Sequence, residues 1–444
     1  MASLSEHPTV QAFQARQQYE HPPAAVDRNW LRTLCLELGA DDVGFVEIER
    51  SELESERPHI LAAFPHTRTL ISLVRRMNRE NIRTPARSVA NVEFHHTNHD
   101  LEEVARKIVA ALEQRNIRAI CPAVGFPQEM DRYPGRIWVV AHKPIAVAAG
   151  MGQMGIHRNV IHPRFGNFIL LDTILMEATL DDYSQPIDYN PCLECKLCVA
   201  ACPVGAIGSD GHFNFSACMT HNYHEFMGGF NDWVEKVADS KNAVEYREKV
   251  TPSESASMWQ SLSFKANYKA AYCMAVCPAG EDVIGPFLEN RKTYLQDVVK
   301  PLQNKEEPIY VTPGSDAEEY VKRRFPHKTI RHVHNGLRTP SIARFLGGLP
   351  LVFQREKATE MDVTYHFTFT GQEKRTTTII IRHKTLQIQD GLKGEADLVI
   401  KVDSATWLKI LDKKQNIILA ILQRKLQLKG SPQLLRAFER CFAA

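Results

Sequence analysis

Long apolar runs are missing from this sequence, and so is a strong excess of charge of either sign. No stretch approaches the about 20 predominantly apolar residues that a transmembrane helix needs. The first residues, MASLSEHPTVQAFQARQQYEHPP, contain neither the apolar segment of a secretory signal nor a twin-arginine pair. The formal net charge of +2 gives no electrostatic reason to expect nucleic acid as a partner. We therefore expect a cytoplasmic protein with no membrane span and no nucleic-acid partner.

Cysteine is scarce outside one short region of the chain. Of the 10 cysteines, only Cys35, Cys121 and Cys441 lie outside residues 192–277, and these three are far apart in the sequence. Scattered cysteines do not make a disulfide framework, and disulfides are rare in a reducing compartment. The clustered cysteines therefore need a different explanation.

The clustered cysteines begin with the segment PCLECKLCVAACP, which has the spacing C-x2-C-x2-C-x3-C-P. Bacterial ferredoxins use this spacing to hold [4Fe-4S] clusters, and the fourth cysteine of the run binds a second cluster. A returning cysteine before proline, in CMAVCP, fits the ligand that completes the first cluster. The predicted ligands of the first cluster are Cys192, Cys195, Cys198 and Cys277. Those of the second are Cys202, Cys218 and Cys273.

The second cluster is one cysteine short, because Ala270 stands three residues before Cys273, where a thiolate is expected. The site could hold a [3Fe-4S] cluster, a [4Fe-4S] cluster with a solvent, substrate or histidine ligand, or no cluster. His221 and His224 follow Cys218 at C-x2-H-x2-H spacing, and a histidine ligand would tend to raise the reduction potential, as in Rieske centres. Cysteine and histidine at short spacing also suit structural zinc, which stays open as an alternative.

The length of 444 residues suits two or three domains, and the 44% hydrophobic and 24% charged residues are typical of globular proteins. The order of helices and strands predicts an α/β layer. Its expected elements are a helix capped by Asp27, a helix starting at Asp100, and strands at 41–48, 69–74, 117–120, 136–142 and 168–178. The fold class we predict is an α/β core with an appended bacterial ferredoxin-like two-cluster module, followed by a separate α+β domain. The boundaries are an N-terminal extension 1–24, the α/β domain 25–185, the ferredoxin-type module 186–300 with a long insertion 219–268, a connector 301–335, and the α+β domain 336–444.

Insertions as long as 219–268 are uncommon inside a compact module, so this one is either a cover for a cluster or pocket or a peripheral helical addition. A second group, His95, His96 and His99 in FHHTNHD, is a candidate metal or acid–base cluster, with loop or capping roles as the alternative.

Three glycines form the segment GMGQMG, with Gly150, Gly152 and Gly155 at the spacing of a dinucleotide fingerprint. The fingerprint should follow a strand, whereas the preceding KPIAVAA looks helical. A structural turn, a nucleotide site and a cofactor contact all stay open for this segment.

The last hundred residues resemble the sterol-carrier-protein-2 family through FTFTGQ, QIQDGLKGEADLVIKV, SATWLKIL and KLQLKGSPQLLRAFERCF. The resemblance implies a sterol-carrier-protein-2-like fold, in which a five-stranded sheet and several helices enclose an apolar tunnel. It also implies a lipid or apolar small molecule as a partner, or a docking role for the same fold.

Residues 28–300 resemble the group that contains epoxyqueuosine reductase and the reductive dehalogenases. The resemblance runs through LGADDVGFVEI, KPIAVAAGMGQMGIHRNVIHPRFGNFILLDTILMEATL and CLECKLCVAACPVGAI. It implies two [4Fe-4S] clusters and cobalamin, with Gly150, Gly152, Gly155, His157 and Arg158 as cofactor-binding residues. The sequence departs from the group at Ala270 and near Arg136, where the proton-donating carboxylate of epoxyqueuosine reductase would stand; Tyr133 is the weak counterpart of the dehalogenases' tyrosine donor.

Together these patterns predict an iron–sulfur oxidoreductase that relays electrons to a corrinoid and acts on an apolar or lipid-like substrate. A ferredoxin or flavodoxin would supply the electrons. The alternative is an electron carrier, scaffold or lipid-binding redox sensor without a corrinoid. The catalytic residues, the general acid among them, are not predicted.

Overall fold

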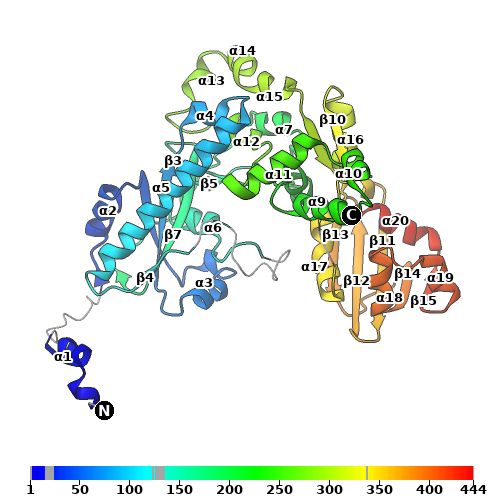
Figure 1. The fold of residues 1–444 in the computed structure, drawn as a ribbon, viewed down its shortest axis with the longest axis horizontal. Helices are drawn as coiled ribbons and strands as arrows, with labels where there is room; N and C mark the ends of the chain where they lie inside the picture. Colours follow the sequence, from blue (N-terminus) through cyan, green and yellow to red (C-terminus); the bar gives the residue numbers. More distant parts are fainter. Residues whose placement is uncertain (1–2, 16–24, 123–124, 126–135, 337–338, 444) are drawn as a thin grey trace.

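The computed structural model describes residues 3–15, 25–122, 125, 136–336 and 339–443. Figure 1 shows an N-terminal sheet with its helices, a central helical region in green, and a C-terminal sheet flanked by helices. Within the described residues, no helix combines the length and the apolarity that crossing a membrane would require.

The N-terminal sheet has the strand order β2-β3-β7-β4, and all three pairings are antiparallel. One face packs on helices α2 (Arg28–Glu37) and α5 (Arg87–Glu113), and the other on α3 (Arg57–Ala63) and α6 (His142–Ala148). The strands are β2 (Asp42–Glu47), β3 (Thr69–Arg76), β4 (Ala119–Ile120) and β7 (Ile169–Met176). Helices therefore cover both faces of a sheet, as an α/β layer requires, and the neighbouring strands of this sheet are antiparallel.

Two predicted elements of this layer are wrong. The helix expected to start at Asp100 starts at Arg87, because Ala90, Thr97 and Leu101 continue one buried face through the expected start. The strand expected at residues 136–142 is absent; this segment leads into α6, and Val140 is buried against the core below the sheet. The cap of α2 is confirmed, since the Asp27 carboxylate accepts the Trp30 N–H at 2.6 Å.

The cysteine-bearing helices of the central region are short. They are α7 (Leu197–Ala201), α8 (Phe215–Asn222) and α12 (Tyr272–Ala275), and α7 packs against α12. The insertion between α8 and α12 forms α9 (Gly228–Ala238), α10 (Ala243–Lys249) and α11 (Pro252–Phe264). After α12 the chain continues in α13 (Gly285–Glu289), α14 (Arg291–Tyr294) and α15 (Lys300–Asn304).

The stretch expected to be a connector is folded. Strands β9 (Pro308–Val311) and β10 (Thr329–His332) pair in parallel, and α16 (Asp316–Arg324) joins them. Ile309, Val321 and Phe325 belong to the same hydrophobic core as α7 and α12. The sequence looked like a linker because its many charges cover the exposed face of an amphipathic helix. This stretch is therefore part of the core of the cysteine-bearing region.

The C-terminal sheet has five strands in the order β13-β12-β11-β14-β15, with β11 and β14 parallel and the other pairs antiparallel. Its strands are β11 (Asp362–Thr370), β12 (Arg375–Arg382), β13 (Thr385–Asp390), β14 (Leu398–Asp403) and β15 (Leu426–Gly430). Helices α17 (Ile342–Val352), α18 (Ser404–Leu411), α19 (Ile417–Leu422) and α20 (Pro432–Arg440) accompany it. Phe345, Phe367 and Trp407 fill its core.

Candidate iron–sulfur and cofactor site

The four cysteines predicted to bind the first cluster are together. Cys192, Cys195, Cys198 and Cys277 line one small cavity of about 30 Å³, between the loop before α7 and the segment after α12. Burial, and the negative charges of the neighbouring thiolates, raise the pKa of Cys277 to about 12 despite the backbone N–H of Ala279. Binding of a metal cluster would release the protons of these thiols, because the metal ligand is the thiolate.

The three cysteines predicted to bind the second cluster are also together, in the wall of a much larger cavity of about 710 Å³. Cys202, Cys218 and Cys273 all line this cavity. The Cys202 sulfur accepts the Ala206 N–H at 3.2 Å, and burial raises the pKa of Cys273 to about 12. The cavity includes the space that a cysteine-bound group would itself fill. The second set therefore fits an iron–sulfur cluster that faces a ligand-sized space.

The backbone shows that Ala270 holds the place of a cysteine. Cys195 is followed by Lys196, whose φ of 52° is left-handed, and α7 starts at the next residue. Ala270 is followed by Ala271, whose φ is also 52°, and α12 starts at the next residue. Both helices carry a cysteine at their second residue. The two segments are thus local repeats, and Ala270 corresponds to Cys195.

A single zinc ion is not what this arrangement suits. Across the described parts of the chain, no three or more histidine, cysteine, aspartate or glutamate side chains converge as ligands of one metal ion. In an iron–sulfur cluster each thiolate binds a different iron, so the sulfur atoms surround a larger body. The geometry of the side chains therefore favours clusters over mononuclear zinc.

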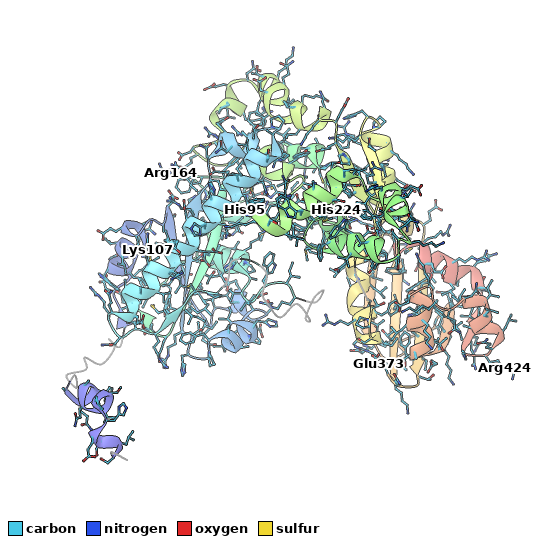
Figure 2. All side chains as sticks on the ribbon, in the orientation of Figure 1. His95, Lys107, Arg164, His224, Glu373 and Arg424 are labelled. Carbon is cyan, nitrogen blue, oxygen red and sulfur yellow. The ribbon has the colours of Figure 1, made fainter. Side chains whose placement is uncertain are left out.

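Of the two histidines after Cys218, only one faces the large cavity. His221 lines it, and its Nδ1 accepts the Tyr310 N–H at 3.3 Å. His224 instead stacks on the Tyr310 ring at 3.8 Å and is not among the lining residues that the structure describes. Figure 2 labels His224 in the central region, beside the insertion helices. His221 is therefore the histidine of this pair that a ligand in the cavity would meet.

The wall of the cavity is mostly apolar, and its polar part includes hydrogen-bond donors that have no partner. The buried nitrogen atoms of its lining residues that have no partner include Arg87 Nε, His157 Nε2, Asn167 Nδ2 and His221 Nε2. Lys143 lines it as well and donates to the Arg158 carbonyl at 2.7 Å and the Asn159 Oδ1 at 2.9 Å. Among the lining residues in the described part of the chain there is no aspartate or glutamate. The wall is therefore suited to a ligand rich in acceptor atoms or negative charge.

The glycine segment forms a turn just before His157 and Arg158, which line the cavity. Gly150 (φ 73°) follows the end of α6, and Gly152 (φ 146°) precedes the hairpin of β5 (Gln153–Met154) and β6 (Val160–Ile161). A Cβ on Gly155 would lie 2.9 Å from the His157 ring. The three glycines are absent from the described lining residues, whereas His157 and Arg158 are present. No strand leads directly into the turn and no helix follows it, so it does not have the form of a dinucleotide loop.

Among the residues that the structure describes near the position expected for a proton donor, Arg136 stands in place of a carboxylate. Arg136 donates to Glu56 at 2.7 Å and to the Val139 carbonyl at 3.3 Å, so its charge is already compensated. Tyr133 lies outside the described residues. His95 of α5, labelled in Figure 2, contacts the Ala266 carbonyl at 2.6 Å. His95, His96 and His99 all lie within α5, and the described residues do not bring them together with other side chains as ligands of one metal ion.

The insertion contributes to the cavity with its ends. His221, Asn222, Tyr223 and Tyr268 line the cavity, while α9, α10 and α11 contribute no described lining residue. Arg87, Lys143 and Asn167 were not expected at this site. Lys143 and Asn167 lie within the segment that carries the resemblance, but nothing in its spacing marks them, and Arg87 comes from a separate segment that only the folded chain brings near.

Comparison with known proteins matches two parts of the chain to family models. Residues 354–443 match the SCP-2 sterol transfer family, and residues 186–208 match the 4Fe-4S binding domain. The chain is similar to the epoxyqueuosine reductase of Cyclobacterium marinum, with 29% identity over 119 residues, 24% of this chain and 38% of the relative. It is 27% identical to that of Escherichia coli over 112 residues, 25% of this chain and 28% of the relative. The matched part thus spans less than two fifths of these relatives' length.

Two solved structures are also similar at low identity. The epoxyqueuosine reductase from Streptococcus thermophilus gives a TM-score of 0.36 at 16% identity, covering 61% of this chain and 75% of that chain. A catabolic reductive dehalogenase gives a TM-score of 0.37 at 16% identity, covering 64% of this chain and 35% of that chain.

Proposed function

We propose that this protein is an iron–sulfur oxidoreductase that holds two clusters and delivers electrons to a ligand in the large cavity. The observation that carries the proposal is the convergence of the two cysteine sets. One set surrounds a small cavity of about 30 Å³, and the other lies in the wall of the 710 Å³ cavity. His157 lines both cavities, so the two sites are neighbours. The similarity to epoxyqueuosine reductases and to the 4Fe-4S binding domain supports the same class of chemistry.

The clusters would supply single-electron transfer between an external donor, such as a ferredoxin or flavodoxin, and the cavity. The chain's own residues hold them in place. Burial lowers the pKa of Lys143, and the negative charges of Cys273 and Cys218 oppose this shift. A charged Lys143 would offset part of the negative charge of the second site. Apolar side chains such as Val204 and Phe213 exclude water from the same wall. Such an environment sets the potential through burial and charge.

Cobalamin is the cofactor we propose for the rest of the cavity, where it would supply a low-valent cobalt centre for reduction. A corrin ring carries many amide groups, and the unpartnered donors of the wall fit their carbonyl oxygens. The chain would hold it through His157 Nε2, Asn167 Nδ2 and the side chain of Arg158, which now donates to the Gly211 carbonyl at 3.2 Å. The glycine turn would serve by positioning His157 and Arg158.

The substrate we propose is an apolar or lipid-like molecule that the C-terminal domain presents or shelters. The match of residues 354–443 to the SCP-2 sterol transfer family supports it. Because no aspartate or glutamate is among the described lining residues, the proton for a reduced product would come from another kind of group or from solvent. Epoxyqueuosine, named for the relatives, is the competing substrate.

The test is the metal content and spectrum of protein purified without oxygen from cells supplied with cobalamin. Iron and sulfide for two clusters, about seven to eight irons per chain, with nearly one cobalt, would support the proposal. Arg158→Ala should lower the cobalt content and leave the iron unchanged, whereas the exposed Arg424→Ala should change neither. Iron without cobalt would instead support an electron carrier, and iron for one cluster would contradict the two-cluster proposal.

A further inference from the structure

We infer that the second cluster keeps one iron without a protein ligand, and that this iron binds a small anion or an anionic atom of the substrate from the large cavity. The inference rests on the proposed function, because it requires a cluster at Cys202, Cys218 and Cys273. It adds a ligand-binding site that a fully cysteine-bound cluster would not have.

The first step is the position of Ala270. This residue repeats the local backbone of Cys195, as the matching left-handed residues Lys196 and Ala271 show. Ala270 lines the cavity and is only 4% exposed, and its N–H donates to the Asn222 Oδ1 at 2.9 Å. The backbone at Ala270 therefore has the conformation found at the predicted cluster ligand Cys195. The methyl side chain of Ala270 has no lone pair, so it cannot bind a metal.

The second step is that no other cysteine takes the place. Cys35 and Cys121 belong to the core of the N-terminal sheet, and Cys441 belongs to the core of the C-terminal domain. None of these three is among the residues that line either cavity in the described chain. The missing thiolate is not replaced from elsewhere in the chain.

The third step concerns His221 and His157 in the cavity wall, whose Nε2 atoms are hydrogen-bond donors in the neutral rings. His221 Nδ1 accepts the Tyr310 N–H, so in the neutral ring the proton is on Nε2, the atom that has no partner. His157 has the same arrangement, since its Nδ1 accepts the Asn159 N–H at 3.2 Å and its Nε2 has no partner. A metal ligand needs a lone pair on the coordinating nitrogen, which a protonated Nε2 lacks. These rings suit a hydrogen bond to a bound ligand.

The fourth step is the charge around the open position. Arg87 donates to the carbonyls of Ile82 and Thr84, both at 3.0 Å, while its Nε has no partner and its guanidinium lies 5.3 Å from the centre of the Tyr272 ring. Burial lowers the pKa of both Arg87 and Lys143, and the charge of Cys273 opposes this shift at each residue. The described lining residues include the cations Arg87, Lys143 and Arg158 and no carboxylate, and this favours an anion over a neutral ligand. Binding forms one metal–ligand bond from a lone pair of the anion and changes no oxidation state.

The experiment uses the full chain, purified without oxygen and reduced with dithionite, with cyanide as the anionic probe. Electron paramagnetic resonance reads each cluster, and the first cluster serves as an internal reference. Wild type, Ala270→Cys and His221→Gln are compared. Ala275→Cys is the matched control, because it adds the same thiol at a buried position of the next helix that lines neither cavity.

We expect cyanide to shift the signal of the second cluster in wild type, in Ala275→Cys and in His221→Gln. Ala270→Cys should weaken this response about tenfold or more, because its thiolate fills the position. Mild oxidation with ferricyanide should convert the second cluster of wild type to a three-iron signal, and Ala270→Cys should resist this loss.

Four results would overturn the inference. Equal cyanide responses in wild type and Ala270→Cys would show that the position is not the open one. If cyanide did not shift the second-cluster signal of wild type but did shift that of His221→Gln, His221 would be the fourth ligand. If both clusters were present in wild type and cyanide shifted neither signal, the second cluster would have no open iron. The proposed function would still stand. Iron for only the first cluster, in wild type and Ala270→Cys alike, would overturn the proposed function as well.

Discussion

A buried ion pair behind the second cysteine set offers a sharp test of how the fold supports the site. Lys328, whose side chain is 1% exposed, donates to Glu307 at 2.7 Å and to the Lys305 carbonyl at 2.8 Å. The Glu307 carboxylate also accepts the Tyr272 hydroxyl at 2.7 and 2.9 Å. Tyr272 directly precedes Cys273, so this network connects the β9–β10 pair to a predicted cluster ligand.

Lys328→Met should therefore destabilise the protein strongly. It leaves the Glu307 charge buried with only the more distant Lys305 at 3.5 Å, and removing one partner of a buried pair costs about 3–5 kcal/mol. Equilibrium urea unfolding under nitrogen, read by circular dichroism, measures the free energy of unfolding. The second cluster should also lose iron faster to a chelator than the first, because Tyr272 loses its fixed acceptor.

The double variant Lys328→Met with Glu307→Gln should recover most of this loss, since it removes the unpaired charge and keeps an acceptor for Tyr272. Lys414→Met is the control, because that lysine is 71% exposed and its pair with Asp412 should contribute no more than about 1 kcal/mol. A Lys328→Met protein within about 0.5 kcal/mol of wild type, with unchanged iron release, would refute the reasoning.

Three further predictions concern separate parts of the molecule. Burial raises the pKa of Asp172 to about 8, so the folded protein keeps a proton that the unfolded chain has released. The free energy of unfolding should therefore fall as pH rises from about 4 to 8. Asp172→Asn should flatten that part of a pH–stability curve. Cys198→Ala should remove the signal of the first cluster, while Cys121→Ala, which is half-buried in another core, should keep both signals. Trp407→Ala should cost the C-terminal domain about 3–5 kcal/mol in thermal unfolding and leave both cluster signals in place.

Much of the cluster site was predictable from the sequence, because the chemistry fixes the spacing of cysteines within a short segment. The partition of seven cysteines into two sets, and the place of Ala270 opposite Cys195, follow from spacing and agree with the folded geometry. The strands and caps of the C-terminal sheet were also predictable, since alternating apolar residues and the Asp403 cap are local signals.

Other features were not predictable, because they depend on contacts between distant segments. The order and antiparallel direction of the strands in the N-terminal sheet depend on the path of the connecting segments. The periodicity of apolar residues does not encode that path. The α5 start was missed because Asp100 is a good cap residue in sequence but lies on a helix whose buried face begins earlier. The donors Arg87 and Asn167 reach the cavity from segments about 80 residues apart in the chain, so no motif joins them.

The central claim is that the two cysteine sets hold two clusters, one of them incomplete. Its most direct test is iron and sulfide analysis with electron paramagnetic resonance of wild type and Ala270→Cys purified without oxygen. The account predicts two clusters in both proteins, with a three-iron signal after mild oxidation in wild type that is lost in Ala270→Cys. The same iron content and the same spectra in both proteins, before and after oxidation, would contradict it.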